Sequence, residues 1–428
     1  MTRMSQRVPA LLLALVIILP GCRSRTNITP TAGELGRLSA AVGFLAARVE
    51  KSGGFIAGAD QRERASEYAY LYDNALAAMV LATAGARWHA ECIADAIVFA
   101  QEHDRSFRDG RLRNAYVSGD PKSDSGRSIA AGKVAIRLPG FWKDGRWQED
   151  YHTVSTSTGN MAWAILALVS VARGADEAKR GEYLAAACRA ADFVLELESA
   201  SGGFTAGHEG WDDVQTKVSY KATEHNIDLI TAFASLGAAL ADDDPQRAAV
   251  YAAAAEHAER FVLAMHDPDL HCFYTGTEAD GVTISDGVIP LDTNSLAVLT
   301  LGERLDDAGQ TIAFVENRMA VGEGFDFSAG DLDGIWNEGT AQMAVCYSLL
   351  GDQENYDRLM SYLKTQAYRD GSVPAADRDG VSTGFQIVGT DILGEYNNVL
   401  SISATAWYAL AELEINPFDP AQTQAQTG

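Results

Sequence analysis

The sequence predicts an all-α protein whose main domain is an (α/α)6 toroid, in which six helical hairpins close into a double ring. Two observations carry this prediction: one pattern repeats six times, and amphipathic helices alternate with helices that are apolar on nearly all sides. Each repeat joins its two helices through a glycine-containing turn such as Gly53-Gly54-Phe55 or Gly202-Gly203-Phe204. A helix that is apolar all round must be covered on both sides, so the second helix of each repeat belongs to the inner layer.

The elements follow in order along the chain. Amphipathic outer helices are predicted over residues 34–50, 89–103, 180–198, 246–265, 310–319 and 354–366. Apolar inner helices are predicted over residues 72–84, 158–172, 224–236, 293–305, 338–350 and 403–413. An open solenoid would share this pattern, but six units of irregular length favour closure. No Pro/Ser-rich linker divides the chain, which indicates one domain.

The N-terminus predicts export with a lipid anchor. Arg3 and Arg7 precede an apolar run over residues 10–19, which is shorter than the roughly 20 residues of a membrane-spanning helix. Leu19-Pro20-Gly21-Cys22 resembles a bacterial lipobox, in which cleavage leaves Cys22 as the lipidated first residue. We expect a signal peptide over 1–21, a polar tether over 22–33, the toroid over 34–418 and a disordered tail over 419–428. Ordinary cleavage with Cys22 incidental is the alternative.

The charge balance narrows the class of partner. The chain has 34 Lys and Arg residues against 58 Asp and Glu residues, a formal net charge of −24. Such a surface repels nucleic acid and suits a neutral or cationic ligand, although acidity also serves solubility alone. We expect no nucleic-acid partner and membrane contact only through the lipid anchor. The sequence leaves the oligomeric state open.

The cysteines predict no metal site and no cofactor. Cys92, Cys188, Cys272 and Cys346 are widely spaced, without a CxxC motif or a histidine pair at ligand spacing. Three of them fall within helical patterns and are interpreted as small core residues. An oxidising compartment would permit a disulfide, but the sequence selects no pair.

Polar side chains gather where the inner helices begin, and in a toroid these ends surround one mouth. Ser, Thr, Asp and Asn are also the residues that cap helix N-termini, so capping is the alternative explanation. The densest group runs from Lys221 to Asp228. Glu224 and Asp228 are four residues apart and share a helical face, so their mutual repulsion can keep a carboxyl protonated. A protonated carboxyl is what a general acid needs.

Glu224 is therefore the first candidate catalytic acid, with Asp73 or Asp292, ahead of Glu338, as its partner across the mouth, and Asp228 as a further catalytic candidate. An acidic, aromatic mouth suits a sugar, whose apolar faces stack while its hydroxyls bond to carboxylates and amides. The candidate substrate-binding residues are Tyr72, Asn160, Trp163, His225, Asn226, Trp336, Asn337, Glu338 and Trp407, with Trp142. Trp142 lies in an insert over residues 114–155, and we expect this insert to wall or cover the mouth, with a second excursion over 374–398 opposite it.

With these motifs the sequence resembles the six-hairpin glycosidases over residues 33–416. Ser157-Thr158-Gly159-Asn160 with Trp163, and the segment from Lys221 to Asp228, resemble secreted bacterial toroids associated with exopolysaccharide. The resemblance implies cleavage of a glycosidic bond by two carboxylates. Related toroids include sugar epimerases, which use His, and polysaccharide lyases, which use Tyr with His or Asn. Tyr72, Tyr220 and His225 keep both alternatives open. A polysaccharide-binding lipoprotein without activity is a further alternative.

Overall fold

The computed structural model describes residues 39–58, 67–124, 135–386 and 391–423, without the side chains of residues 123, 124, 141, 142 and 147. The predicted signal peptide, Cys22 and the tether lie outside the described residues. Trp142 is described only by its backbone.

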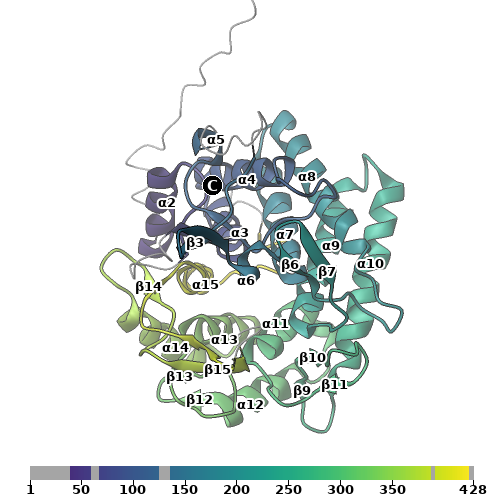
Figure 1. Cartoon of the computed structure of the whole chain (residues 1–428). Helices are drawn as coiled ribbons and strands as arrows, with labels where there is room; N and C mark the ends of the chain where they lie inside the picture. The colour runs from purple at the N-terminus through teal and green to yellow at the C-terminus, as the bar shows by residue number, and fades with distance from the viewer. Residues whose placement is uncertain (1–38, 59–66, 125–134, 387–390, 424–428) are drawn as a thin grey trace, which may run out of the picture.

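Twelve main helices alternate between two layers in the described part of the chain (Figure 1). The outer helices are α2 (Ala40–Ser52), α4 (Arg87–Glu102), α8 (Glu177–Leu195), α10 (Pro245–Ala264), α12 (Ala308–Met319) and α14 (Gln353–Gln366). The inner helices are α3 (Leu71–Thr83), α7 (Thr158–Gly174), α9 (Thr223–Leu240), α11 (Leu291–Leu301), α13 (Asn337–Leu350) and α15 (Ile402–Glu412). Each inner helix packs on the next, and α15 packs on α3, so the ring is closed. The predicted (α/α)6 toroid is confirmed.

Short helices and small antiparallel sheets occupy the connections. The short helices are α5 (Pro121–Asp124), α6 (Tyr151–Val154) and the 3₁₀ turn η3 (Gly302–Arg304). One sheet has three strands, β5 (Thr156–Ser157), β6 (Gly207–Trp211) and β7 (Val214–Lys217). The two-stranded sheets pair β1 (Tyr68–Tyr70) with β2 (Ala115–Val117), β3 (Gly140–Lys143) with β4 (Arg146–Glu149), β8 (His266–Asp267) with β9 (Cys272–Phe273), β10 (Gly276–Thr277) with β11 (Ile284–Ser285), β12 (Ala320–Val321) with β13 (Gly324–Phe325), β14 (Val373–Pro374) with β17 (Leu400–Ser401), and β15 (Val381–Gln386) with β16 (Leu393–Tyr396).

A repeated hydrogen bond holds each inner helix to the turn before it. In every unit the fourth residue after the N-cap accepts the backbone N–H of a turn residue. The accepting residues are Asn74, Met161, Asn226, Asn294, Thr340 and Thr405, and their donors are Ile56, Leu112, Phe204, Phe273, Phe325 and Val373. Asn226 also donates to the carbonyls of Phe204 at 3.0 Å and Ala222 at 2.9 Å. The predicted substrate-binding role of Asn226 is therefore corrected: its fully buried amide fastens a turn.

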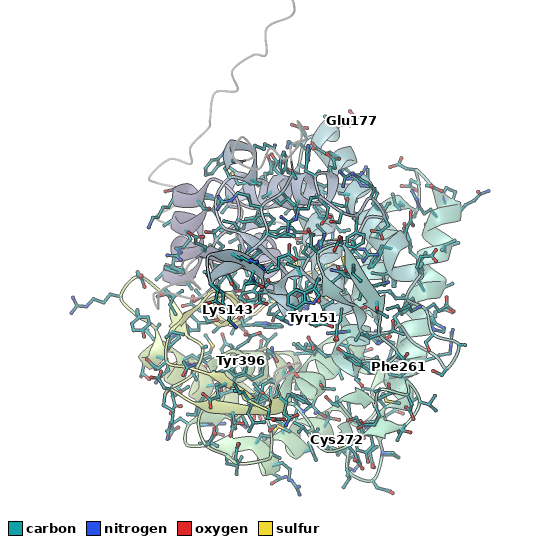
Figure 2. The ribbon with its side chains drawn as sticks, in the orientation of Figure 1. Lys143, Tyr151, Glu177, Phe261, Cys272 and Tyr396 are labelled. Carbon is teal, nitrogen blue, oxygen red and sulfur yellow. The ribbon has the colours of Figure 1, made fainter. Side chains whose placement is uncertain are left out.

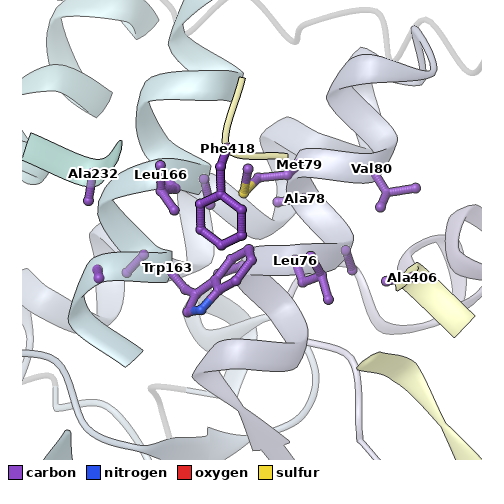
Figure 3. Close-up of a cluster of buried hydrophobic side chains, with 14 of the residues drawn as sticks. Leu76, Ala78, Met79, Val80, Trp163, Leu166, Ala232, Ala406 and Phe418 are labelled. Carbon is purple, nitrogen blue, oxygen red and sulfur yellow. The ribbon is translucent and has the colours of Figure 1, made fainter. Parts of the chain in front are cut away.

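The core fills the ring below the mouth, and a C-terminal segment closes it. Figure 3 shows Phe418 over Trp163 among Leu76, Met79 and Leu166, and the two rings lie 5.4 Å apart. Beyond Phe418, the guanidinium of Arg173 donates to the Thr423 hydroxyl at 2.6 Å. Residues 419–423, assigned from sequence to the tail, therefore pack against the ring.

Two further observations concern the chain as described. The four cysteines from Cys92 to Cys346 are all free. None of the described helices combines the length and the apolar character that crossing a membrane requires.

Candidate functional site

A cavity of about 790 Å³ opens where the inner helices begin. The second residue after each inner N-cap lines it, and these six residues are Tyr72, Gly159, Glu224, Asp292, Glu338 and Ser403. We call them the N2 ring. Three consecutive inner helices, α9, α11 and α13, each contribute an acid to it, and Asp73 of α3 adds a fourth carboxylate to the cavity. The fold thus brings Glu224 together with both of its predicted partners and with Glu338.

Capping does not explain these residues. Five of the six inner helices have no side-chain cap hydrogen bond, the exception being Ser401 of α15. The N-cap of α9 is Ala222, and the Thr223 hydroxyl, which is buried, has no partner. Side-chain caps occur instead on outer helices, for example Asp176 on α8 and Asp244 on α10. The residues of the N2 ring therefore line the cavity and do not serve as the N-caps of their helices.

Burial is the main reason why the cavity acids hold protons. It raises the pKa of Asp73 to about 8 and that of Glu338 to about 7, with smaller contributions from neighbouring negative charges. Burial also raises the pKa of Glu224, and the charges of Asp292 and Glu338 add to it. Burial raises the pKa of Asp292 as well, but hydrogen bonds from Thr293 offset part of that rise. Glu224 is thus suited to hold a proton, and Asp292 to hold a charge.

Asp228 differs from the other four acids because it does not line the cavity. It lies one helical turn below Glu224 and is fully buried. Burial raises its pKa well above the usual range, and the charges of Glu224 and Asp292 add to this. Direct catalysis by Asp228 is therefore not supported. The proton on Glu224 also depends on burial and on Asp292 more than on the predicted repulsion from Asp228.

A chain of hydrogen bonds orients Glu338. The indole N–H of Trp407 donates to the Tyr72 hydroxyl at 2.8 Å, and that hydroxyl donates to Glu338 Oε1 at 2.6 Å. Trp407 is fully buried and does not line the cavity, so its predicted contact with substrate is corrected to a supporting role. Asn337 is also corrected, because its buried amide bonds to the carbonyl of Pro374 and the hydroxyl of Tyr362.

His225 lines the cavity as a neutral base. Burial lowers its pKa to about 4, and its Nε2 lies 3.3 Å from the Ser157 hydroxyl. A Cβ on Gly159 would lie 2.5 Å from His225 Cδ2, so glycine is required where α7 passes the imidazole. The Nδ1 atom of His225 has no hydrogen-bond partner, so no carboxylate orients the imidazole as a catalytic triad would require.

The aromatic wall is only partly the predicted one. Tyr72, Trp163 and Trp336 line the cavity together with Asn160, as expected. Trp142 cannot be placed, since its side chain lies outside the described residues. Five further residues line the cavity although no sequence pattern marks them: Phe327, Phe385, Tyr396, Gln342 and His152.

Tyr396 stands out among these additional residues. It stacks on Trp336 at 5.4 Å, and the charges of all four cavity acids raise its pKa after burial. It belongs to the β15–β16 hairpin in the excursion over 374–398, which does wall the cavity. Figure 2 shows Tyr396 and Tyr151 on opposite sides of the centre of the ring.

One group of described acids has the spacing of a metal site. Oxygens of Asp326, Asp331 and Asp333 lie within 4.8 Å of one another. Asp326 accepts backbone N–H groups from Phe327 and Asp333, so its carboxylate shapes the loop that carries Phe327 to the cavity.

Comparisons with known proteins agree with the fold. No family model and no curated protein matches the chain. Among solved structures, a wild-type glycosidase is 16% identical, with a TM-score of 0.59 over 91% of this chain and 100% of that one. A variant described as a glycosidase in complex with glucose matches at 16% identity, over 90% and 99% of the two chains, with a TM-score of 0.58.

Two further matches are an epimerase and a glucoamylase. Cellobiose 2-epimerase from Bacillus thermoamylovorans is 10% identical, over 87% of this chain and 95% of that one, with a TM-score of 0.57. A bacterial glucoamylase complexed with acarbose is 12% identical, over 90% and 56%, with a TM-score of 0.58. At these identities the likeness shows the (α/α)6 toroid alone.

Proposed function

We propose that this protein is a glycoside hydrolase of a polysaccharide or oligosaccharide, with Glu224 as general acid and Asp292 as general base. The observation that carries the proposal is the N2 ring, which puts two buried, mutually repelling carboxylates into an aromatic-lined cavity. The solved structures it resembles include glycosidases, and two of these hold glucose or acarbose.

The chemistry follows from the different surroundings of the two acids. Glu224, protonated because it is buried, gives its proton to the glycosidic oxygen as the bond from that oxygen to the anomeric carbon breaks. Asp292, held ionised by Thr293, takes a proton from a water whose oxygen bonds to the anomeric carbon. One water is consumed, and exchange with solvent returns the proton to Glu224 and removes it from Asp292. Glu338 and Asp73 remain to bind hydroxyl groups.

The charge of the cavity supports a neutral or amino-sugar substrate over a uronate. Lys221 is the only Lys or Arg among the described lining residues, and its ammonium turns away to the Ser201 hydroxyl at 2.8 Å and the Gly202 carbonyl at 2.9 Å. A sugar carboxylate would therefore face four acids without a cation to pair with. The lipobox at Cys22 adds the proposal that the protein is exported, lipid-anchored and acts at the cell envelope, where an exopolysaccharide is a suitable substrate.

The test is a panel of neutral, amino and uronic glycans whose products are read by mass spectrometry. Hydrolysis adds the mass of water, elimination creates unsaturated ends, epimerisation leaves the mass unchanged, and a binding protein leaves the glycan intact. Glu224→Gln is nearly isosteric and should lower turnover by at least about 10²-fold, the lower range for a general acid. Glu182→Gln, at an exposed position of α8, is the matched control and should keep full turnover.

Sugar epimerisation is the second candidate, because two histidines, His152 and His225, line the cavity. Epimerisation would give a new stereoisomer of unchanged mass. If His225→Asn abolishes that product and Glu224→Gln retains it, epimerisation is favoured over hydrolysis.

A further inference from the structure

One large aromatic side chain on a hairpin next to the cavity lining is exposed although the structure holds it firmly. Trp211 ends strand β6 at the tip of the β6–β7 hairpin, and 51% of its surface is accessible. Its indole packs edge-on against Tyr151 of α6, with the ring centres 5.3 Å apart. Tyr151 is half-buried, so the two rings together present one fixed aromatic face to the solvent. An aromatic face held in place in this way can receive a ligand.

A network of ion pairs fixes the turn that carries Trp211. The guanidinium of Arg113 is fully buried and bonds to Asp104 at 2.6 Å and to the Asp212 carboxylate at 2.8 Å. It also donates to the carbonyls of Asp212 and Val154, and thereby ties the hairpin to the end of α6. Arg105 adds a second pair to Asp212 at 2.6 Å.

Burying an arginine is costly even when it is paired, so such a network is weak evidence for stability. What it does achieve is position: Trp211 and Tyr151 stand on two segments that Arg113 joins. Gly210 also fixes the hairpin just before its tip. Its φ is 149°, and a Cβ there would lie 2.1 Å from the Val214 carbonyl oxygen, so this position requires glycine.

The aromatic pair lies on segments that also carry, or bond to, residues of the cavity lining. Tyr151 is followed by His152, which lines the cavity. On the hairpin, Glu209 accepts a hydrogen bond of 2.8 Å from the hydroxyl of Tyr220, another lining residue. Figure 1 shows α6, β6 and β7 side by side near the centre of the ring.

We infer that Trp211 and Tyr151 form a sugar-binding subsite outside the cavity, and that the substrate is an extended glycan chain whose distal unit stacks on this pair. The inference rests on the proposed function and adds the length of the substrate to it. Aromatic faces suit the apolar faces of a pyranose, and a preorganised pair binds without the entropy cost of ordering two mobile side chains.

The experiment compares dimers and hexamers. Binding of malto-, cello-, N-acetylchito- and de-N-acetylated chito-oligosaccharides to the Glu224→Gln protein is measured by calorimetry, so that no cleavage intervenes. In the series that binds, the Trp211→Ala exchange should weaken the hexamer about tenfold, the scale of one good stacking contact, and leave the dimer unchanged. Trp211→Phe should retain most of the hexamer affinity.

Trp88→Ala is the matched control, since Trp88 lies in the first turn of the outer helix α4, whose start is on the face opposite the mouth. It should leave both affinities unchanged. If Trp211→Ala lowers the affinity for dimer and hexamer equally, or lowers neither, the subsite is wrong and the proposed hydrolysis is unaffected. Absence of binding and of cleavage for every glycan would overturn the proposed function and the subsite together.

Discussion

Replacing Asn226 with Ala tests whether the inner helices are built as the structure indicates. The Asn226 amide accepts the Phe204 N–H at 2.8 Å and donates to the carbonyls of Phe204 and Ala222. Alanine would leave both backbone groups of Phe204 buried without a partner, at roughly 1–3 kcal/mol each. Alanine's better helix propensity returns at most about 0.7 kcal/mol. The free energy of unfolding should therefore fall by about 1–5 kcal/mol.

The measurement is urea unfolding followed by circular dichroism, with the Michaelis constant (KM) on a confirmed substrate measured in parallel. Asn160→Ala is the matched control, because Asn160 lines the cavity and its amide bonds only to Asn114, at 2.8 Å. It should leave unfolding within about 1 kcal/mol, as is usual away from buried networks, and raise KM. The opposite result, a stable Asn226→Ala protein with a raised KM, would refute the role assigned to Asn226 and restore substrate binding.

Three further predictions follow. Hydrolysis needs Asp292 ionised and Glu224 protonated, so turnover should rise with pH through about 6, fall through about 8, and give a bell-shaped profile in steady-state assays; a flat profile would contradict the pair. Asp73 has a pKa of about 8 in the fold against an ordinary 3.8, so the folded state binds the extra proton and its stability falls as pH rises between these values. Thermal unfolding should show that Asp73→Asn gains stability at pH 8 and little at pH 4, whereas an equal effect at both would reject the raised pKa. Cys22→Ser should move the protein from the membrane to the soluble fraction; unchanged fractionation without lipid on the N-terminal peptide would exclude the anchor.

The fold could be predicted because its signals are periodic. The outer helices show an apolar stripe with a period of three to four residues, and the inner helices show a continuous apolar run. Six such pairs specify the two layers. The boundaries follow less closely: the fourth inner helix begins at Leu291 and passes into a 3₁₀ turn at Gly302. Local turns of this kind leave no periodic signal.

The site could be predicted only in part, for two physical reasons. Glu224, Asp292 and Glu338 were found because a carboxylate at the start of an apolar helix is conspicuous. Asn226 was misassigned because an asparagine near a helix start has the same composition signal whether it faces a ligand or a turn. Tyr396 lies on a hairpin with no helical period, so its place at the cavity depends on tertiary contacts alone.

Helix geometry explains why the toroid separates stability from chemistry. Successive residues turn by about 100°, so a residue two positions after the N2 ring points to the opposite side of the helix, and one four positions after it points almost the same way, one turn deeper. On α9 these positions are Glu224 in the cavity, Asn226 on the turn and Asp228 beneath the cavity. The same offsets give Ser403, Thr405 and Trp407 on α15.

The N2 positions can therefore change without loosening the hairpins, since the residues two places later hold each helix to its turn. The N2 ring is accordingly varied, with Tyr, Gly, Glu, Asp, Glu and Ser. The residues that accept the turn N–H are nearly all Asn or Thr. Met161 is the exception among these accepting residues, because its thioether accepts the N–H of Leu112 at 3.2 Å. Because sulfur is a weak acceptor, the turn of this second unit is held least by its hydrogen bond and most by packing against Trp163 and its neighbours.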